Sequence, residues 1–178
     1  MADKLAIDGG KPVLDAKKIK PWPVLDERDR QAVLRVLEGE FLCGGEAPEA
    51  LALEEEWARY VGRKHCLATS SGTAALHMAL AALNIGPGDE VIVPSYTFLA
   101  SASSILHAGA IPVFVDIDRR TYTIDPALIE EKISERTKAI IPVHLHGLPA
   151  DMDRIMEVAK KHNLHIIEDA CQAHGAEY

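Results

Sequence analysis

Residues 165–175 read HIIEDACQAHG, an apolar run that gives way to two acids, a glutamine, a histidine and a glycine. Leu164, Ile166 and Ile167 predict a short buried strand, because the run is too brief for a helix and rich in β-branched residues. Asp169 follows at the carboxyl end of this strand, where open α/β sheets bind their ligands. A carboxylate at such a buried edge is costly without a cationic partner, so we expect Asp169 to face a cation.

Apolar runs and helix signals alternate along the rest of the chain. The strands read as continuous apolar stretches, which is typical of a parallel sheet covered by helices on both faces. A helix that is apolar on all sides, near 73–85, is expected to be buried. Strands are predicted near 64–69, 91–93, 111–115, 139–143 and 164–168, and helices near 27–38, 48–60, 73–85, 95–107, 126–133 and 151–162.

Two parts of unequal size are expected. Residues 1–24 carry glycines, prolines and isolated apolar residues such as Ile7, Val13 and Trp22, and predict an extended N-terminal arm lying on its own or a partner's surface. Residues 25–178 predict a single α/β domain.

Composition narrows the classes of function. The net charge of −8 argues against nucleic acid as a partner, because phosphate binding requires a basic face. No secretory signal and no apolar run long enough to span a membrane are visible, which predicts a cytoplasmic protein without a membrane partner. Cys43, Cys66 and Cys171 fit neither a disulfide framework nor a zinc spacing, and are expected to be reduced thiols.

The segment SSGTAAL, residues 70–76, joins a predicted strand to the apolar helix. Free N–H groups at a helix start, with hydroxyl groups beside them, can hold a phosphate, although the same residues also form an ordinary N-cap. The chain has neither a P-loop motif nor a G-x-G-x-x-G fingerprint. A phosphorylated ligand other than an ordinary nucleoside triphosphate or NAD is therefore favoured.

Aromatic and acidic side chains at the same sheet edge suggest a flat heteroaromatic ligand. Phe98 could stack on such a ring, or could be a core aromatic. Asp169 could pair with a pyridine nitrogen and keep it protonated, or could be a helix cap or an ion-pair member. Gln172 could bind a hydroxyl group on the ring.

Six stretches of the chain form an ordered set of motifs: SSGTAAL (70–76), GPGDEVIVPSYTF (86–98), GAIPVFVDID (109–118), TKAIIPVHLHG (137–147), PADMD (149–153) and IIEDACQAHGA (166–176). Taken together, these motifs resemble the DegT/DnrJ/EryC1/StrS sugar aminotransferases, which use pyridoxal 5'-phosphate (PLP) on the large α/β domain of fold type I. The resemblance implies that Gly72, Thr73 and Ala74 hold the cofactor phosphate. It also implies that Phe98 stacks on the pyridine, that Asp169 pairs with N1, and that Gln172 contacts the 3-hydroxyl group.

One part of the family pattern is missing. The Schiff-base lysine of the family lies beyond the motif that ends near Gly175, and no lysine of this chain stands at that position. From the resemblance we also expect the small C-terminal domain of the family to be absent from this chain. We therefore expect an N-terminal portion of an aminotransferase, truncated and inactive alone, whose full-length form is a homodimer. The resemblance implies a nucleotide-linked keto sugar as substrate and glutamate or glutamine as amino donor.

Other interpretations stay open at this level. Some relatives are dehydratases that use the aminated cofactor and have histidine in place of the lysine. A truncated subunit could also pair with a complete copy without being catalytic. More distantly, His144 and His146 lie two residues apart at a strand end and, with Asp169 and His174, could bind a metal in a hydrolase.

Overall fold

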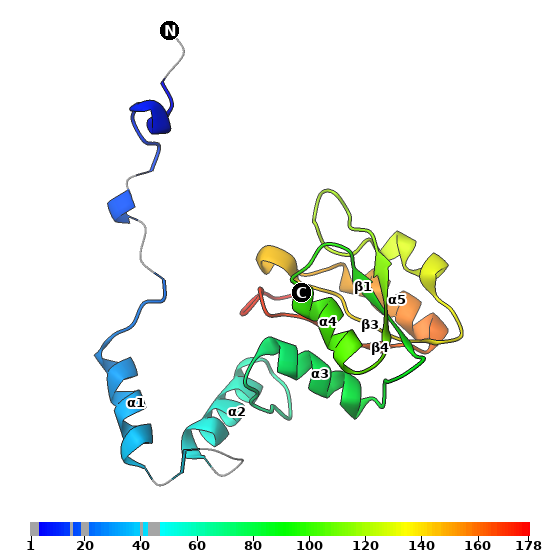
Figure 1. Ribbon diagram of the computed structural model, residues 1–178, viewed down its shortest axis with the longest axis horizontal. Helices are drawn as coiled ribbons and strands as arrows, with labels where there is room; N and C mark the ends of the chain where they lie inside the picture. The colour runs from blue at the N-terminus through cyan, green and yellow to red at the C-terminus, as the bar shows by residue number, and fades with distance from the viewer. Residues whose placement is uncertain (1–3, 15, 19–21, 40, 43–46) are drawn as a thin grey trace.

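The computed structural model describes residues 4–14, 16–18, 22–39, 41–42 and 47–178 (Figure 1). Its sheet confirms the predicted parallel α/β class, with strand order β2-β1-β3-β4 and parallel pairing throughout. The strands are β1 (Glu90–Pro94), β2 (Ile111–Val115), β3 (Thr137–Ile140) and β4 (His165–Ile166). Cys43 and Ile19 lie outside the described residues.

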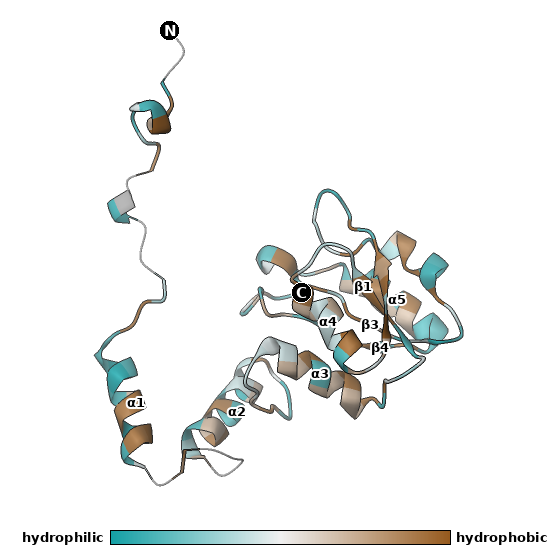
Figure 2. Ribbon diagram, in the orientation of Figure 1, coloured by the Kyte–Doolittle hydropathy of each residue, from teal (hydrophilic) through white to brown (hydrophobic). Residues whose placement is uncertain are grey.

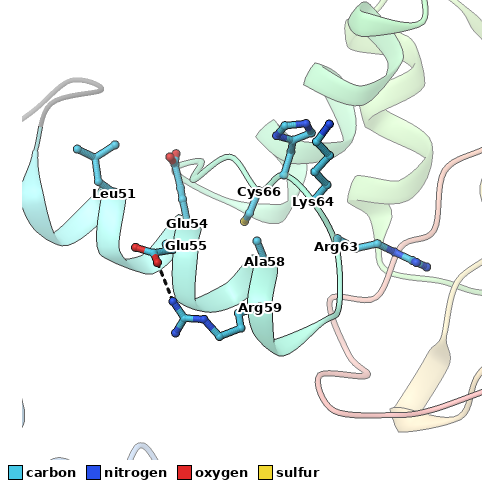
Figure 3. Close-up of a pocket in the computed structure, with 9 residues that line it drawn as sticks. Leu51, Glu54, Glu55, Ala58, Arg59, Arg63, Lys64 and Cys66 are labelled. Atoms are coloured by element: carbon cyan, nitrogen blue, oxygen red, sulfur yellow. Dashed lines mark hydrogen bonds and ion pairs between the residues drawn. The ribbon is translucent and has the colours of Figure 1, made fainter.

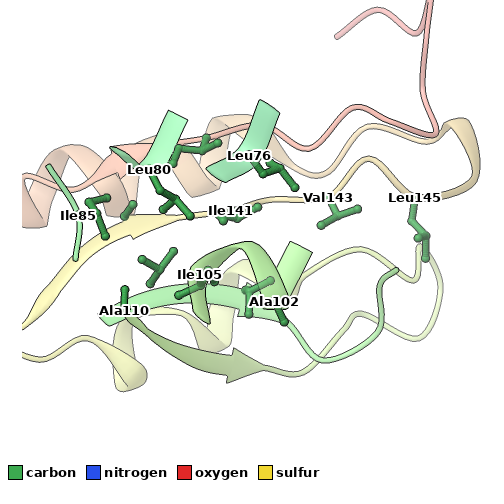
Figure 4. Close-up of a cluster of buried hydrophobic side chains, with 13 residues drawn as sticks. Leu76, Leu80, Ile85, Ala102, Ile105, Ala110, Ile141, Val143 and Leu145 are labelled. Carbon is green, nitrogen blue, oxygen red and sulfur yellow. The ribbon is translucent and has the colours of Figure 1, made fainter. Parts of the chain in front are cut away.

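The sheet is covered on both faces at β1, whose neighbouring residues enter different cores, whereas the edge strand β2 is partly open, with Ile111 43% and Phe114 51% exposed. Val91 and Val93 of β1 belong to one cluster with residues of α3 (Gly72–Ala82) and α4 (Leu99–His107). Figure 4 shows Leu76 and Leu80 of α3 together with Ala102 and Ile105 of α4 in this cluster. Ile92, between Val91 and Val93, belongs to a second cluster with α5 (Met152–His162). This two-sided burial explains why the strands are continuous apolar runs.

The apolar helix α3 is less buried than its sequence predicts. Leu76 and Leu80 are buried against α4 and the sheet, whereas His77 and Met78 are exposed. The expectation of a helix buried on all sides is therefore wrong for the described chain: α3 has one covered face and one open apolar face.

Several predicted boundaries also need correction. Residues 64–69 are not a strand, and no described strand pairs with them. The helix predicted from residue 95 begins at Leu99, because the Ser95 N–H is bonded to Val115 O at 2.8 Å and Phe98 is extended. In place of the helix predicted over 126–133 there are two 3-10 turns, η3 (Pro126–Leu128) and η4 (Glu130–Lys132).

Strand β3 ends three residues early, at Ile140. Pro142 follows, and a proline has no N–H to donate to a ladder. Pairing resumes as an isolated parallel bridge between Val143 and Asp169. The irregular carboxyl ends of β3 and β4 are thus tied together beside the acid singled out from the sequence.

The described residues before α2 (Pro48–Tyr60) lie apart from the α/β body in Figure 1, whereas α2 reaches it: the ring centroid of Trp57 lies 5.6 Å from that of His174. Helix α1 (Glu27–Glu38) begins with a capping box at Asp26, and α2 has proline at its first position. No residue of α1 is buried, although Val33, Leu34 and Leu37 form the apolar stripe visible in Figure 2. Short 3-10 turns precede α1: η1 (Ala6–Asp8) and η2 (Ala16–Lys18). Among the described helices, none has the length and apolar character required to cross a bilayer.

Candidate active site

The candidate site is built at the carboxyl edge of the sheet, where Asp169 is held by its backbone. The Asp169 N–H donates to Pro142 O at 2.9 Å, and its carbonyl accepts from the His144 N–H at 3.0 Å. These two bonds continue the β3–β4 pairing beyond the strands themselves. Asp169 is buried at this position, with only 6% of the residue exposed.

The carboxylate of Asp169 has hydrogen-bond donors but no cation. Ser101 Oγ donates to Oδ2 at 2.7 Å, and the Cys171 N–H donates to Oδ1 at 3.2 Å. None of the ion pairs formed within the described residues includes Asp169. A buried anion is stabilised when a positive charge reaches it, so this carboxylate is suited to a cationic ligand atom.

The N-terminus of α3 offers two free N–H groups. Ser71 is the N-cap, and its Oγ accepts from the Ala74 N–H at 3.2 Å. The N–H groups of Gly72 and Thr73 have no acceptor in the described part of the chain. Gly72 and Thr73 can therefore donate to an anion directly, while Ala74 is already engaged by the cap.

The helix start and the Asp169 loop are in contact. A Cβ atom placed on Gly72 would lie 2.5 Å from the Sγ atom of Cys171, two residues after Asp169. A larger residue at this position would require the Cys171 side chain, the loop or the helix start to move. Partial burial of the Cys171 thiol, together with the neighbouring Asp169, raises its pKa to about 11, so its sulfur stays neutral beside the helix start.

Phe98 and Gln172 lie at the same edge. Phe98 is the N-cap residue of α4 and is 69% exposed, so it is not a core aromatic in this chain. Gln172 accepts through Oε1 from the His146 N–H at 3.2 Å. The ring of Phe98 is thus available for stacking, and the amide of Gln172 is oriented by the loop that follows β3.

The two histidines of the metal interpretation do not form one site. They lie beyond the end of β3, so the alternation of a strand does not apply to them, and His144 is buried while His146 is exposed. Nδ1 of His144 accepts from the Ala150 N–H at 3.1 Å, which leaves Nε2 to donate to Glu168 Oε2 at 3.0 Å and lowers the pKa of Glu168. The described residues contain no group of three metal-ligating side chains.

Three aromatic side chains meet at this edge that were not singled out from the sequence as a group. The ring centroid of Tyr96 lies 6.0 Å from that of Tyr122 and 6.4 Å from that of His146. Tyr122 and His146 both have positive φ, an unfavourable backbone conformation that tends to cluster at functional sites. Tyr96 falls within a recognisable motif, whereas nothing in the sequence around Tyr122 signals its place here.

A separate open pocket lies between α2 and the segment that follows it (Figure 3). It contains none of the predicted cofactor residues, and its charges include an ion pair between Arg59 and Glu55 at 2.7 Å. We therefore place the candidate site at the sheet edge and not in this pocket. The pocket is lined by Leu51, Glu54, Glu55, Ala58, Arg59, Arg63, Lys64, His65 and Cys66.

Comparison with known proteins identifies relatives over most of the chain. The profile of the DegT/DnrJ/EryC1/StrS aminotransferase family matches residues 23–178. GDP-perosamine synthase of Caulobacter vibrioides is 50% identical over 156 residues, which cover 88% of this chain and 42% of that protein. A dTDP-3-amino-3,4,6-trideoxy-alpha-D-glucose transaminase of Streptomyces venezuelae is 47% identical and covers 94% of this chain and 43% of its own length.

A solved structure extends the similarity to a protein with cofactor. The crystal structure of ntda from Bacillus subtilis with bound cofactor PMP matches with a TM-score of 0.79 and 37% identity, covering 93% of this chain and 39% of that one. The chain thus spans about two fifths of the length of the relatives it matches.

Proposed function

The chain belongs to the DegT/DnrJ/EryC1/StrS aminotransferase family, and from this premise we propose that it provides the N-terminal, PLP-binding part of a sugar aminotransferase. The relatives described above include a GDP-perosamine synthase and a dTDP-amino-sugar transaminase. They support a nucleotide-linked keto sugar as the substrate of the whole enzyme. Glutamate or glutamine is proposed as amino donor from the family resemblance.

One observation carries the proposal: a buried carboxylate without a cation adjoins a helix start with free N–H groups. The first is Asp169, and the second is formed by Gly72 and Thr73, whose contact with the Asp169 loop is made through Cys171. PLP carries both complementary groups, a protonatable ring nitrogen and a phosphate. The chain's polar groups therefore match the two ends of this cofactor.

Each predicted residue except Ala74, whose N–H is bonded to Ser71 Oγ, has a role consistent with its surroundings. Asp169 would hold a proton on N1, Gly72 and Thr73 would bind the phosphate, and Phe98 would cover one ring face. Gln172, oriented by His146, would bind the 3-hydroxyl group. When bound, PLP supplies an electron sink for the carbanion chemistry of amino transfer.

Covalent attachment of PLP is not expected of this chain. Its ten lysines stand at positions 4, 11, 17, 18, 20, 64, 132, 138, 160 and 161, and none of them occupies the family's Schiff-base position. We propose that the chain binds the cofactor without an aldehyde–lysine bond and does not complete transamination by itself, since that lysine also serves as base. Borohydride treatment of the PLP-loaded chain, followed by mass spectrometry, should reveal no specific phosphopyridoxyl-lysine.

The cofactor proposal is tested by equilibrium binding of pyridoxamine 5'-phosphate, which needs no lysine. Asp169→Asn removes the negative charge opposite N1 and should weaken binding at least ~10-fold, because a hydrogen bond to a charged group is worth about 1.5–3 kcal/mol. Asp153→Asn, which removes an exposed carboxylate from α5, is the matched control. Equal affinity of the Asp169→Asn variant and the unmodified chain would contradict the proposed site.

We further propose that the whole enzyme is a homodimer. The apolar stripe of α1 and the open face of α3 support an interface, because monomeric proteins rarely leave large apolar patches uncovered. The −8 net charge of the chain gives no support to a nucleic-acid partner.

A further inference from the structure

We propose that Ser101 is a positioning residue that fixes the Asp169 carboxylate relative to the ring face set by Phe98. The inference rests on the proposed function, because it concerns how this chain prepares its cofactor site. Ser101 belongs to α4 and lies 68 residues before Asp169 in the chain.

The hydroxyl group of Ser101 is committed to Asp169. Ser101 is fully buried, and its Oγ donates its one proton to Asp169 Oδ2 at 2.7 Å. Thr97 Oγ1 lies 2.8 Å from Ser101 Oγ, and since the serine proton is already used, the threonine hydroxyl must donate to the serine oxygen. Thr97, Ser101 and Asp169 thus form a directed chain of hydrogen bonds that ends on the carboxylate.

Each carboxylate oxygen of Asp169 has its own donor. Ser101 bonds to Oδ2 and the Cys171 N–H bonds to Oδ1. Two donors on two oxygens fix the orientation of the carboxylate plane. Loss of the serine donor would leave one oxygen of a buried anion without its internal partner, which is unfavourable at a site sheltered from water.

Ser101 also connects this anion to the proposed stacking residue. Its main-chain N–H donates to Phe98 O at 3.1 Å, in the first turn of α4. Ser101 therefore contacts both residues: its side chain bonds to Asp169, the proposed partner of N1, and its backbone bonds to Phe98, the proposed stacking residue. Ser101 thereby fixes the position of the Asp169 carboxylate relative to Phe98, and with it the place where a ring nitrogen can meet the carboxylate.

A second buried serine in the same helix shows that this arrangement is not a general feature of α4. Ser104 is also fully buried, but its Oγ donates to the carbonyl oxygen of Ser101 at 3.2 Å, a local bond within the helix. Ser104→Ala is therefore a matched control: it removes a buried hydroxyl group from the same helix without touching Asp169.

The test compares Ser101→Ala, Ser101→Thr and Ser104→Ala in the full 178-residue chain. The first readout needs no cofactor: amide hydrogen exchange at Cys171, whose N–H is bonded to Asp169 Oδ1. In Ser101→Ala the carboxylate loses one of its two anchors, and exchange at Cys171 should accelerate about 10-fold. Ser101→Thr, which keeps the hydroxyl group, should restore slow exchange, and Ser104→Ala should leave it unchanged.

The second readout uses ¹⁵N-labelled pyridoxamine 5'-phosphate. In Ser101→Ala its affinity should fall about 10-fold, and the ¹⁵N shift of N1 at fixed pH should move toward the unprotonated value, which a purely structural loss of helix stability would not produce. Unchanged Cys171 exchange in Ser101→Ala, or equal changes in Ser104→Ala, overturns the inference. If Cys171 exchange responds as expected but the chain does not bind pyridoxamine 5'-phosphate, the proposed function is overturned, whereas the Ser101–Asp169 contact remains supported.

Discussion

Among single residues, Gly72 matters because it has no Cβ atom, which lets the start of α3 lie against the Asp169 loop. Gly72→Ala places a Cβ atom 2.5 Å from Cys171 Sγ, so the Cys171 side chain, the helix start or the Asp169 loop must shift. We expect a loss of about 1–3 kcal/mol in the free energy of unfolding, as for other overpacked sites, and at least ~10-fold weaker binding of pyridoxamine 5'-phosphate. Urea unfolding and equilibrium binding measure the two effects.

Two further variants make this prediction specific. Gly86→Ala is the control, because its Cβ atom would meet nothing closer than 3.7 Å. Combining Gly72→Ala with Cys171→Ala removes the sulfur atom and should recover most of the lost stability. No recovery in the double variant would show that Gly72 matters for a reason other than this contact.

For the helices and strands, the sequence predicts which kind of element forms more reliably than how deeply the element is buried or which distant residues contact it. The IIED pattern placed Asp169 at a strand end, and the structure has it there because local periodicity and a terminal acid are both visible within a few residues. The bond from Ser101 could not be predicted, since it joins segments 68 residues apart. Helix α3 was expected to be buried because its sequence is apolar on every face. Burial also depends on which elements pack against each face, and this cannot be predicted from the helix sequence alone.

Glu90, at the start of β1, leads to a prediction about how the stability of the chain depends on pH. Glu90 is buried and accepts hydrogen bonds from Ser134, Arg136 and Thr137, which lead into β3. The bond from Ser134, followed by the contacts with Arg136, lowers the pKa of Glu90 below its ordinary 4.5. A lowered pKa stabilises the fold above pH 4.5, and this contribution is lost as the pH falls through the folded-state value.

Glu90→Gln should therefore lower the free energy of unfolding at pH 7. The difference in this free energy between the variant and the unmodified chain should shrink as the solution is acidified below pH 4.5. Urea midpoints measured across this range check the sign. Glu131→Gln, at an exposed residue 3.7 Å from Lys132, is the control and should have little effect at any pH. A loss of stability in Glu90→Gln that grows on acidification would contradict the proposed stabilising role of the charged Glu90 side chain.

For the whole molecule, the uncovered apolar stripe of α1 is the feature that bears on assembly. Leu37 is 65% exposed in the chain, so Leu37→Gln should not lower the stability of the monomer. If a second copy covers α1, burial of this side chain contributes about 1.5–3 kcal/mol per site, and the substitution should weaken self-association at least ~10-fold. Sedimentation equilibrium of Leu37→Gln, with Glu38→Gln as a polar neighbour control, measures this. A loss of monomer stability in Leu37→Gln, with self-association unchanged, would show instead that α1 packs on its own chain, and the proposed dimer would lose this support.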